Sequence, residues 1–563
     1  MSSTARRTST SGVDLGPALG LGAALFVLAL AAALWGVLHG AAAIDHAPAP
    51  ANNPAVLVLG LIDGSVAWTP TATKLAAATG AAVLGLLAVV LWLVLRGSSG
   101  RMPIDKSDQH LARGSRLGPL RASEAAKIAK HLGVDAGPGI PVGTTVKGKR
   151  TLYRSWEDVM LVIAGARIGK TTSFVIPEIL EAPGAVLTTS NKDDVVRTTR
   201  AYRDTIGTTW VFDPQGLVNE RVGWWWNPLS YVTDEVKARS LADMFEAASH
   251  EPDAKVDGYF GPKGRDLLAN LLLAAAVAGK DLTQVYRWLT KPNDDTAATL
   301  LEEHGYDLIA AAVQGAMSAA PEERSGIYGS AEQMAAFMLN RQAMGWVTPP
   351  GRGPRVEFDP HAFVRSSDTL YSLSKEGQGS AGGLVAALAA AVCEAAEELA
   401  KTQGNGRMPV PLLVVLDEAA NVCRWKELPN LYSHYGSRGI LISTYLQSPA
   451  QARAVWGVDG FEKLKSTANV NVYAGGVDDV KYLGELVQSI GKYTHNRPSV
   501  SHGKNGRTVS RQEQADDILD VADLRAMPRG RAIVLASGTR AALVRTTPWM
   551  AGPHAAAVKA AQP

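Results

Sequence analysis

The chain has 563 residues and a formal net charge of +3, so its length predicts two or three domains. The near-neutral charge excludes a bulk basic field directed at nucleic acid. The two cysteines, Cys393 and Cys423, cannot form a disulfide framework, which fits a reducing compartment for the large part of the chain.

The first hundred residues have the pattern of a membrane unit. Residues 15–38 and 75–95 carry no charged side chain, and each run is long enough to cross a bilayer as a helix. We therefore expect a membrane domain over residues 15–98 with two transmembrane helices. Basic residues precede the first run and follow the second. The positive-inside rule therefore places residues 1–14 in the cytoplasm as a short tail. A cleaved signal peptide is the alternative for the first run.

The segment that follows, residues 99–150, contains glycine, arginine and proline with little periodicity. This composition predicts a linker with one short helix near residues 123–131.

Residues 159–173 predict a phosphate-binding loop. Five apolar residues, 159–163, indicate a buried strand, and Gly169-Lys170-Thr171 opens a helix after a loop of small residues. In such a loop backbone N–H groups hold phosphates, the lysine reaches the β- and γ-phosphates, and the threonine hydroxyl ligates Mg²⁺. The pattern G-x-x-x-x-G-K-[ST] has glycine where this chain has Ala164, so the strand-then-helix context supports the prediction. The candidate nucleotide-binding residues are Ala164, Gly165, Ala166, Arg167, Ile168, Gly169, Lys170, Thr171 and Thr172.

Strand and helix signals alternate after this loop, which predicts a parallel α/β sheet. From residue 232 to residue 351 the strand signals fade, and helical runs rich in alanine and leucine dominate. We expect an all-helical domain over 232–351, inserted into an α/β core that comprises residues 151–231 and 352–548. Extra helices packed on the same core are the alternative.

Within residues 409–421, a continuous apolar run predicts a strand that ends in Asp417-Glu418. Beside a phosphate loop, Asp417 would hold Mg²⁺ through water and Glu418 would polarise the attacking water. The alternative is an ordinary buried strand with a solvated acidic turn. A further strand, residues 439–446, ends at Gln447, whose side chain could contact the γ-phosphate.

Two segments near the end predict little fixed structure. Residues 496–514 are polar and rich in glycine and serine, which favours a flexible excursion. Residues 549–563 are rich in alanine and proline and predict a disordered tail.

The order of these motifs resembles the TraG/TraD family, the coupling proteins of type IV secretion systems. Two departures from the family pattern stand out: Ser190–Asp194 replaces Asp-Pro-Lys-Gly-Glu, and the β-branched Ile168 replaces a small residue. The segments that carry the resemblance are 164–170, like the family's Ala-Pro-Thr-Arg-Ser-Gly-Lys; 212–214 and 226–229, like "FDP … WNPL"; 416–421, 437–440 and 446–448, like "LDE … RGI … LQS"; and 476–479.

The resemblance implies a RecA-like ATPase, anchored as a multi-pass protein in the bacterial cytoplasmic membrane with its ATPase domain in the cytoplasm. It would use ATP and Mg²⁺ to deliver DNA, with an attached relaxase-type protein, into a type IV secretion channel during conjugation. Single-stranded DNA is favoured as the cargo, and the chain would form a homo-hexamer with ATP between subunits.

By the same resemblance Glu418 and Gln447 are catalytic, and Thr171 and Asp417 are the metal ligands. The position of Arg438 adds it as a third candidate catalytic residue. Arg438 lies in the turn before strand 439–446 and would reach a neighbour's γ-phosphate; a surface arginine that closes the turn is the equal alternative. Two other functions remain open. One is a DNA pump of the FtsK type, which shares the core, and the other is a membrane receptor that binds nucleotide without hydrolysing it.

Overall fold

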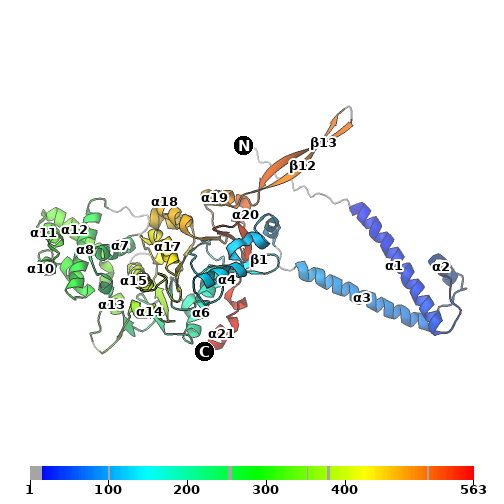
Figure 1. Ribbon diagram of the computed structural model, residues 1–563, viewed down its shortest axis with the longest axis horizontal. Helices are drawn as coiled ribbons and strands as arrows, with labels where there is room; N and C mark the ends of the chain where they lie inside the picture. The colour runs from blue at the N-terminus through cyan, green and yellow to red at the C-terminus, as the bar shows by residue number, and fades with distance from the viewer. Residues whose placement is uncertain are drawn as a thin grey trace. The chain divides into compact units, whose positions relative to one another are not determined.

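The computed structural model describes residues 15–98, 102–250, 257–351, 353–376, 381–503 and 506–562, so the expected tail 1–14 lies outside the described residues. The chain divides into two compact units, residues 1–101 and 102–563. All the strands belong to the second unit (Figure 1).

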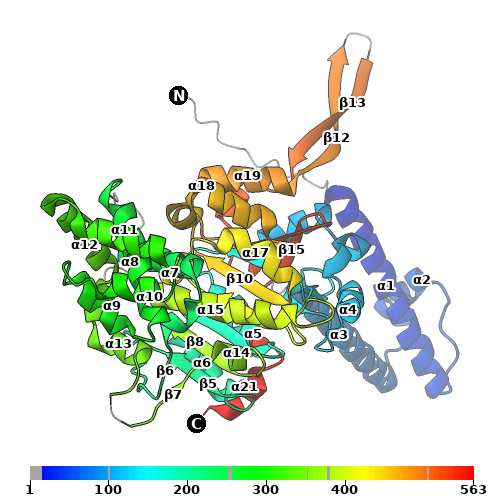
Figure 2. The same ribbon diagram turned by 60° about the vertical axis from the view of Figure 1, so that its left-hand side comes forward.

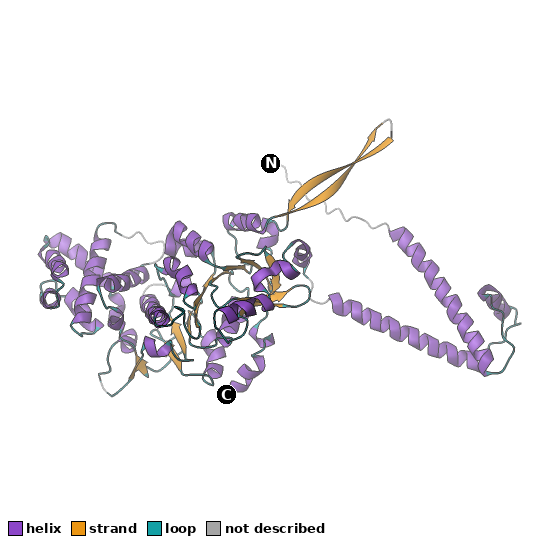
Figure 3. Ribbon diagram, in the orientation of Figure 1, coloured by secondary structure: helices purple, strands orange, loops and turns teal. Residues whose placement is uncertain are grey.

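The first unit is built from helices (Figure 3). A small buried cluster that includes Leu38, Leu57 and Ala72 joins them. The predicted spans 15–38 and 75–95 are helical, but among the described residues no helix combines the length and the hydropathy that crossing a membrane requires. The helices are α1 (Leu15–Ile44), α2 (Pro54–Ile62) and α3 (Pro70–Ser98).

The second unit is organised around an eleven-stranded mixed sheet. Neighbouring strands from β11 to β5 are parallel, whereas those from β11 to β2 pair antiparallel. In spatial order the strands are β2 (Thr151–Arg154), β1 (Ile140–Thr145), β15 (Ala542–Arg545), β14 (Arg531–Ala536), β11 (Val470–Tyr473), β3 (Met160–Ile163), β10 (Ile440–Leu446), β9 (Leu412–Leu416), β4 (Val186–Ser190), β8 (Thr369–Leu373) and β5 (Thr209–Phe212).

The central strands are continuous apolar runs because helices cover both faces of the sheet. Every residue of β3, β9 and β10 is buried. Successive residues belong to opposite faces: Leu161 and Ile163 join one hydrophobic cluster, and Met160 and Val162 join the other. Helices α15 (Gly382–Lys401) and α17 (Leu428–Ser437) cover the first face (Figure 2), and α5 (Ile176–Leu180) and α6 (Asp194–Arg203) cover the second.

The described residues between 232 and 351 form helices and loops. Phe245 and Leu268 belong to the same buried cluster as Leu161 of the sheet, so the helical region and the sheet share one hydrophobic core. This shared core agrees with the alternative, in which the helices of residues 232–351 pack on the same core as the sheet. The division of the chain into an α/β core and an inserted helical domain stays a prediction. The helices of the region are α7 (Glu235–Ser249), α8 (Phe260–Val277), α9 (Leu282–Leu289), α10 (Thr296–Glu303), α11 (Asp307–Ser318), α12 (Pro321–Met334), the 3₁₀ turn Ala336–Leu339 and α13 (Arg341–Val347).

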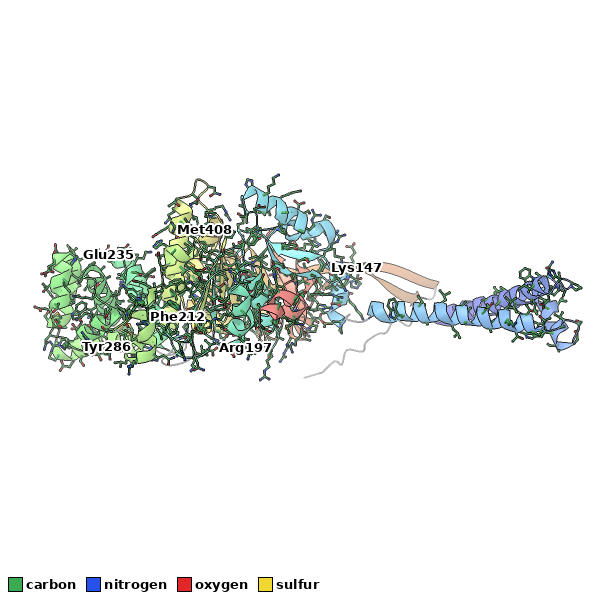
Figure 4. The ribbon with its side chains drawn as sticks, turned by 90° about the horizontal axis from the view of Figure 1, so that it is seen from below. Lys147, Arg197, Phe212, Glu235, Tyr286 and Met408 are labelled. Atoms are coloured by element: carbon green, nitrogen blue, oxygen red, sulfur yellow. The ribbon has the colours of Figure 1, made fainter. Side chains whose placement is uncertain are left out.

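Edge strand β5 connects the sheet to this helical region. Its last residue, Phe212, packs edge-on against Trp346 of α13, with ring centroids 5.9 Å apart. Figure 4 labels Phe212. Other elements of the unit include α14 (Pro360–Phe363), α16 (Ala419–Val422), α18 (Pro449–Thr467), α19 (Val480–Ile490), α20 (Val521–Arg525), the short strands β6 (Trp224–Trp225) and β7 (Val356–Glu357), and the turn Pro228–Tyr231.

The short helix predicted near residues 123–131 is confirmed as α4 (Ala122–His131), but the rest of the described part of segment 99–150 is packed into the fold and is not a loose linker. The segment contributes β1, which pairs with β15, and the backbone N–H of Ala112 donates to Ala541 O at 2.9 Å. A buried ion pair joins Asp105 Oδ1 to Arg531 Nε at 2.6 Å. These partners lie some four hundred positions away in sequence, so local periodicity could not reveal them. The segment also contains the 3₁₀ helices Pro103–His110 and Gly114–Leu120.

Two other segments are more ordered than the sequence predicted. The expected excursion 496–514 lies in a hairpin of β12 (Lys492–Gly503) and β13 (Gly506–Asp517). In the expected disordered tail, the turn Trp549–Ala551 is followed by α21 (Ala555–Ala561). Val558 of α21 is fully buried with apolar residues of α5, so burial against a distant helix orders this tail.

We expect a chain that begins at Met102 to fold, because the whole sheet lies beyond that point. A chain that begins at Ser155 loses β1 and β2 and leaves Arg531 without its buried carboxylate partner. Removing one partner of a buried pair costs about 3–5 kcal/mol. Thermal unfolding followed by circular dichroism should show a much lower transition for the Ser155 fragment. Equal transitions for the two fragments would contradict the structural role assigned to residues 102–154.

Candidate nucleotide-binding site

The predicted phosphate loop leaves the centre of the sheet at the carboxyl end of β3. Its first two residues extend the ladder to both neighbouring strands: Ala164 N–H donates to Leu446 O at 3.0 Å, and Gly165 N–H donates to Gly475 O at 2.9 Å. A Cβ at position 165 would lie 1.9 Å from Gly476 O, so only glycine fits there. Ala164 is fully buried, which shows that the loop accommodates a methyl group at the position where the pattern has glycine.

The loop turns into its helix through two residues of positive φ, Arg167 at 62° and Gly169 at 97°. Positive φ is strained for an arginine, and strain of this kind persists where the surroundings impose the backbone shape. A π-helical turn, Thr171–Val175, then leads into α5. The backbone N–H groups of the loop and of the first helical turn are thereby available to phosphate oxygens.

The unusual Ile168 has a clear packing role. Its side chain is half-buried against the second hydrophobic cluster, and its Cγ1 atom lies 2.6 Å from where a Cβ on Gly476 would be. Ile168 therefore fills the space that glycine leaves at position 476, on the loop that follows β11.

The other departure, Ser190–Asp194, lies at the carboxyl end of β4 and leads into α6. Asn191 hydrogen-bonds Glu376, whose Oε1 also accepts from Asn421 Nδ2 at 2.7 Å. Asn421 lies three residues after Glu418, so this departure contacts the surroundings of the acidic pair through one shared carboxylate.

The acidic pair follows β9, whose neighbours in the sheet are β10 and β4. Lys170 Nζ lies 2.6 Å from Glu418 Oε1 and 3.0 Å from Asp417 Oδ1. Thr171 Oγ1 lies 3.4 Å from Asp417 Oδ2. Only 7% of Lys170, 3% of Asp417 and 5% of Glu418 is exposed. The two halves of the predicted site therefore meet in a buried cluster, as the parallel strand order requires.

Neighbouring strand ends fix the acidic pair. Thr189 Oγ1, on β4, donates to Asp417 O at 2.9 Å, and Gln447 Nε2, just after β10, donates to Glu418 Oε2 at 2.8 Å. Glu418 itself has φ 54° and ψ 40°, a left-handed conformation that is costly for a residue with a side chain. The sequence predicts Gln447 at this site but gives no signal for Thr189, because a threonine near the end of a buried strand is common.

The electrostatics of the cluster leave an excess negative charge. Burial raises the pKa of Asp417, and the nearby Glu418 raises it further, against the opposing effect of Lys170. Burial alone would lower the pKa of Lys170, but the attraction of Asp417 and Glu418 outweighs it and raises that pKa. Both directions follow from one ammonium group shared between two carboxylates.

The oxygen donors of the cluster suit a hard divalent cation. Asp417 Oδ1 is buried and receives no hydrogen bond from the residues that the structure describes, although Lys170 is close enough for an ion pair. Asp417 and the Thr171 hydroxyl are both oxygen ligands of the type that Mg²⁺ prefers. A cation at these two groups would offset the excess charge.

This charge balance predicts a pH-dependent stability. Because the pKa of Asp417 is raised in the folded chain, its ionised form opposes folding above that pKa, and the opposition disappears below about pH 3.8. Without nucleotide, Asp417→Asn should unfold at a higher temperature than the wild type at pH 7, and the difference should shrink as the pH falls. Asp478→Asn, at an exposed position, is the control. A lower unfolding temperature for Asp417→Asn at pH 7 would contradict this charge balance.

Arg438 does not join the cluster within one chain. It lies at the end of α17, before the amino end of β10, and its Nη1 donates to Gly406 O at 3.0 Å. The phosphate loop lies at the opposite, carboxyl end of the strands. A role for Arg438 at a neighbouring subunit's site therefore stays a prediction.

These features define the P-loop nucleotide-binding class. A phosphate loop follows a buried strand, and its lysine and threonine face an Asp-Glu pair at the end of a parallel strand. Residues 411–529 match the family model described as the TraM recognition site of TraD and TraG. A comparison with curated proteins gives no match.

Solved structures of the bacterial conjugative coupling protein TrwB have a similar fold. Its unbound form aligns with a TM-score of 0.52 and 16% identity over 72% of this chain and 88% of that one. TrwB in complex with the ATP analogue ADPNP aligns with a TM-score of 0.52 and 16% identity, over 72% and 89% of the two chains. TrwB in complex with ADP and Mg²⁺ gives 0.52 and 16%, over 72% and 88%. The family-model match confirms the resemblance to the TraG/TraD family over residues 411–529, and the TrwB structures show a shared fold.

Proposed function

We propose that this chain is a coupling ATPase of conjugative DNA transfer. It binds ATP and Mg²⁺ at the loop 164–172 and uses hydrolysis to move DNA, with attached protein, towards a type IV secretion channel. The observation that carries the proposal is the buried contact of Lys170 with Asp417 and Glu418 in a chain with the family segment 411–529. The TrwB complexes with ADPNP and with ADP and Mg²⁺ support the choice of ligands.

Each residue of the cluster has a distinct proposed role. Lys170 and the loop N–H groups bind the phosphates, and Thr171 and Asp417 hold Mg²⁺, which neutralises charge between the β- and γ-phosphates. On ATP binding Lys170 exchanges Glu418 for phosphate oxygens, which frees the Glu418 carboxylate to orient the attacking water. Gln447, already bonded to Glu418, contacts that water or the γ-phosphate.

The proposal also places the amino-terminal unit at the bacterial cytoplasmic membrane. Its support lies in the sequence, in the uncharged runs 15–38 and 75–95 with basic residues on their outer flanks. Anchoring confines subunits to a plane and raises their effective concentration, which favours a hexameric ring.

Steady-state ATP turnover by the full chain tests the function. With Mg²⁺ we expect hydrolysis that single-stranded DNA stimulates more than duplex DNA does. Because backbone contacts release counterions, the stimulation should weaken as salt increases and should not depend on base sequence. Tight ATP binding without turnover, with or without DNA, would contradict the proposal and favour a receptor that only binds nucleotide.

The proposed ring gives Arg438 a test by subunit mixing. Arg438→Ala alone should lower DNA-stimulated turnover by roughly 10³-fold, the scale of an arginine finger. Mixing Arg438→Ala with Lys170→Ala subunits should restore activity, since some interfaces then combine an intact loop with an intact arginine. Mixing Glu418→Gln with Lys170→Ala is the control, and it should restore nothing because both residues act within one subunit. Near-normal turnover by Arg438→Ala alone would exclude the finger role.

A further inference from the structure

We propose that Arg529 is a nucleotide-binding residue that acts within its own subunit, on a phosphate that ADP and ATP share. The inference rests on the proposed function, since it assigns one more contact to the same site. Arg529 lies in the segment Ala526–Gly530, between α20 and β14, more than three hundred positions from the phosphate loop.

The first support is proximity to the loop. A Cβ built on Gly169 would lie 3.9 Å from Arg529 Nη2, next to Thr172 Oγ1 at 3.4 Å and Ser173 Oγ at 3.8 Å. The guanidinium group therefore stands beside the glycine that precedes Lys170, where the loop turns into its helix.

The second support is that no partner of the guanidinium group is found within the described part of the chain. Arg529 is exposed, and it makes no hydrogen bond or ion pair with the residues that the structure describes. Its neighbour Arg531, in contrast, is buried and pairs with Asp105. The planar fork of an arginine suits two phosphate oxygens. The loop side chains that share the space beside Gly169 with it, Thr172 and Ser173, carry uncharged hydroxyl groups.

The third support is the rigid backbone beneath Arg529. Met527 is buried under Gly475, where an added Cβ would come within 2.9 Å of Met527 Cβ. Before Arg529 in the chain, Leu524 O accepts a hydrogen bond from Tyr473 Oη at 3.0 Å. Immediately before it, Pro528 O accepts one from the Arg531 N–H at 3.2 Å. Gly475 O also accepts the hydrogen bond from the phosphate loop. One glycine thus supports both the loop and the segment that carries Arg529, so little backbone ordering remains to oppose binding.

The geometry also indicates which phosphates Arg529 serves. Lys170 and Thr171 face Asp417 and Glu418, the side where the γ-phosphate and Mg²⁺ belong. Arg529 instead stands beside Gly169, in the part of the loop whose backbone N–H groups hold the α- and β-phosphates. Arg529 should therefore strengthen the binding of ADP and ATP alike and leave the hydrolysis step unchanged.

Titration calorimetry of the full chain with ADP and with ADPNP, both with Mg²⁺, tests this assignment. Arg529→Ala should raise both dissociation constants by the same factor, roughly 10-fold or more, the range of charge-assisted hydrogen bonds. Arg529→Lys should recover part of the loss. Arg525→Ala removes the same charge from nearby α20, where the arginine is exposed and pairs with Asp478, and should bind like the wild type.

Three outcomes would overturn the inference. Wild-type affinity of Arg529→Ala for both ligands would show that the residue is not in the site, and weaker binding of ADPNP alone would move it to the γ-phosphate. A lower thermal unfolding temperature for Arg529→Ala without nucleotide would make it a structural residue. If Lys170→Ala weakens binding and Arg529→Ala does not, only this inference fails. If the wild type binds neither ligand, the proposed function fails with it.

Discussion

Lys170→Ala is expected to weaken ATP binding by roughly 100-fold or more, because it removes the charge that contacts two phosphates. The substitution also leaves Asp417 and Glu418 buried side by side without their shared cation. Loss of one partner from a buried pair costs about 3–5 kcal/mol, so the chain without nucleotide should unfold at a lower temperature. Protonation of one carboxylate relieves the repulsion, and the stability deficit should therefore shrink as the pH falls.

Titration calorimetry and thermal unfolding measure these two effects of Lys170→Ala. Lys481→Ala, which removes an exposed lysine from α19, is the matched control and should change neither quantity. An unchanged ATP dissociation constant for Lys170→Ala would show that residues 164–172 do not bind the nucleotide.

Glu418→Gln is expected to reduce turnover by roughly 10²–10⁴-fold, the usual contribution of a general base. Glutamine keeps the shape of the side chain but cannot accept a proton from water. The affinity for ATP should stay the same or increase, because Lys170 no longer has to leave a carboxylate at 2.6 Å. This separation of binding from chemistry distinguishes Glu418 from Lys170.

Steady-state turnover and ADPNP binding, measured on the same preparation, check the Glu418→Gln result. Glu427→Gln changes an exposed glutamate at the start of α17 and should behave like the wild type. Normal turnover in Glu418→Gln would assign the orientation of water to another group.

The parts of the site that could be predicted lie next to strong local patterns. The apolar run 159–163 and the apolar run before Asp417 correspond to β3 and β9, and the strand expected at 439–446 corresponds to β10. Parallel strands bring their carboxyl ends to one edge of the sheet. For this reason Lys170 and Glu418 could be placed together although 248 positions separate them.

The remaining parts depend on contacts that local patterns do not encode. Strand β1 pairs with β15 near the end of the chain, and Val558 orders the carboxyl-terminal helix by burial against α5. Arg529 reaches the phosphate loop through the packing of Met527 on Gly475. Each of these contacts arises from tertiary packing between distant segments, so sequence periodicity gives no signal for it.

ATP-dependent displacement of a protein bound to the end of a DNA strand tests the central claim most directly. The wild-type chain should displace the bound protein with ATP and Mg²⁺, but not with ADPNP. Glu418→Gln should bind the same DNA and displace nothing, because it cannot complete hydrolysis. Displacement at the same rate with ADPNP, or DNA-stimulated ATP turnover without any displacement, would contradict a coupling ATPase that moves DNA.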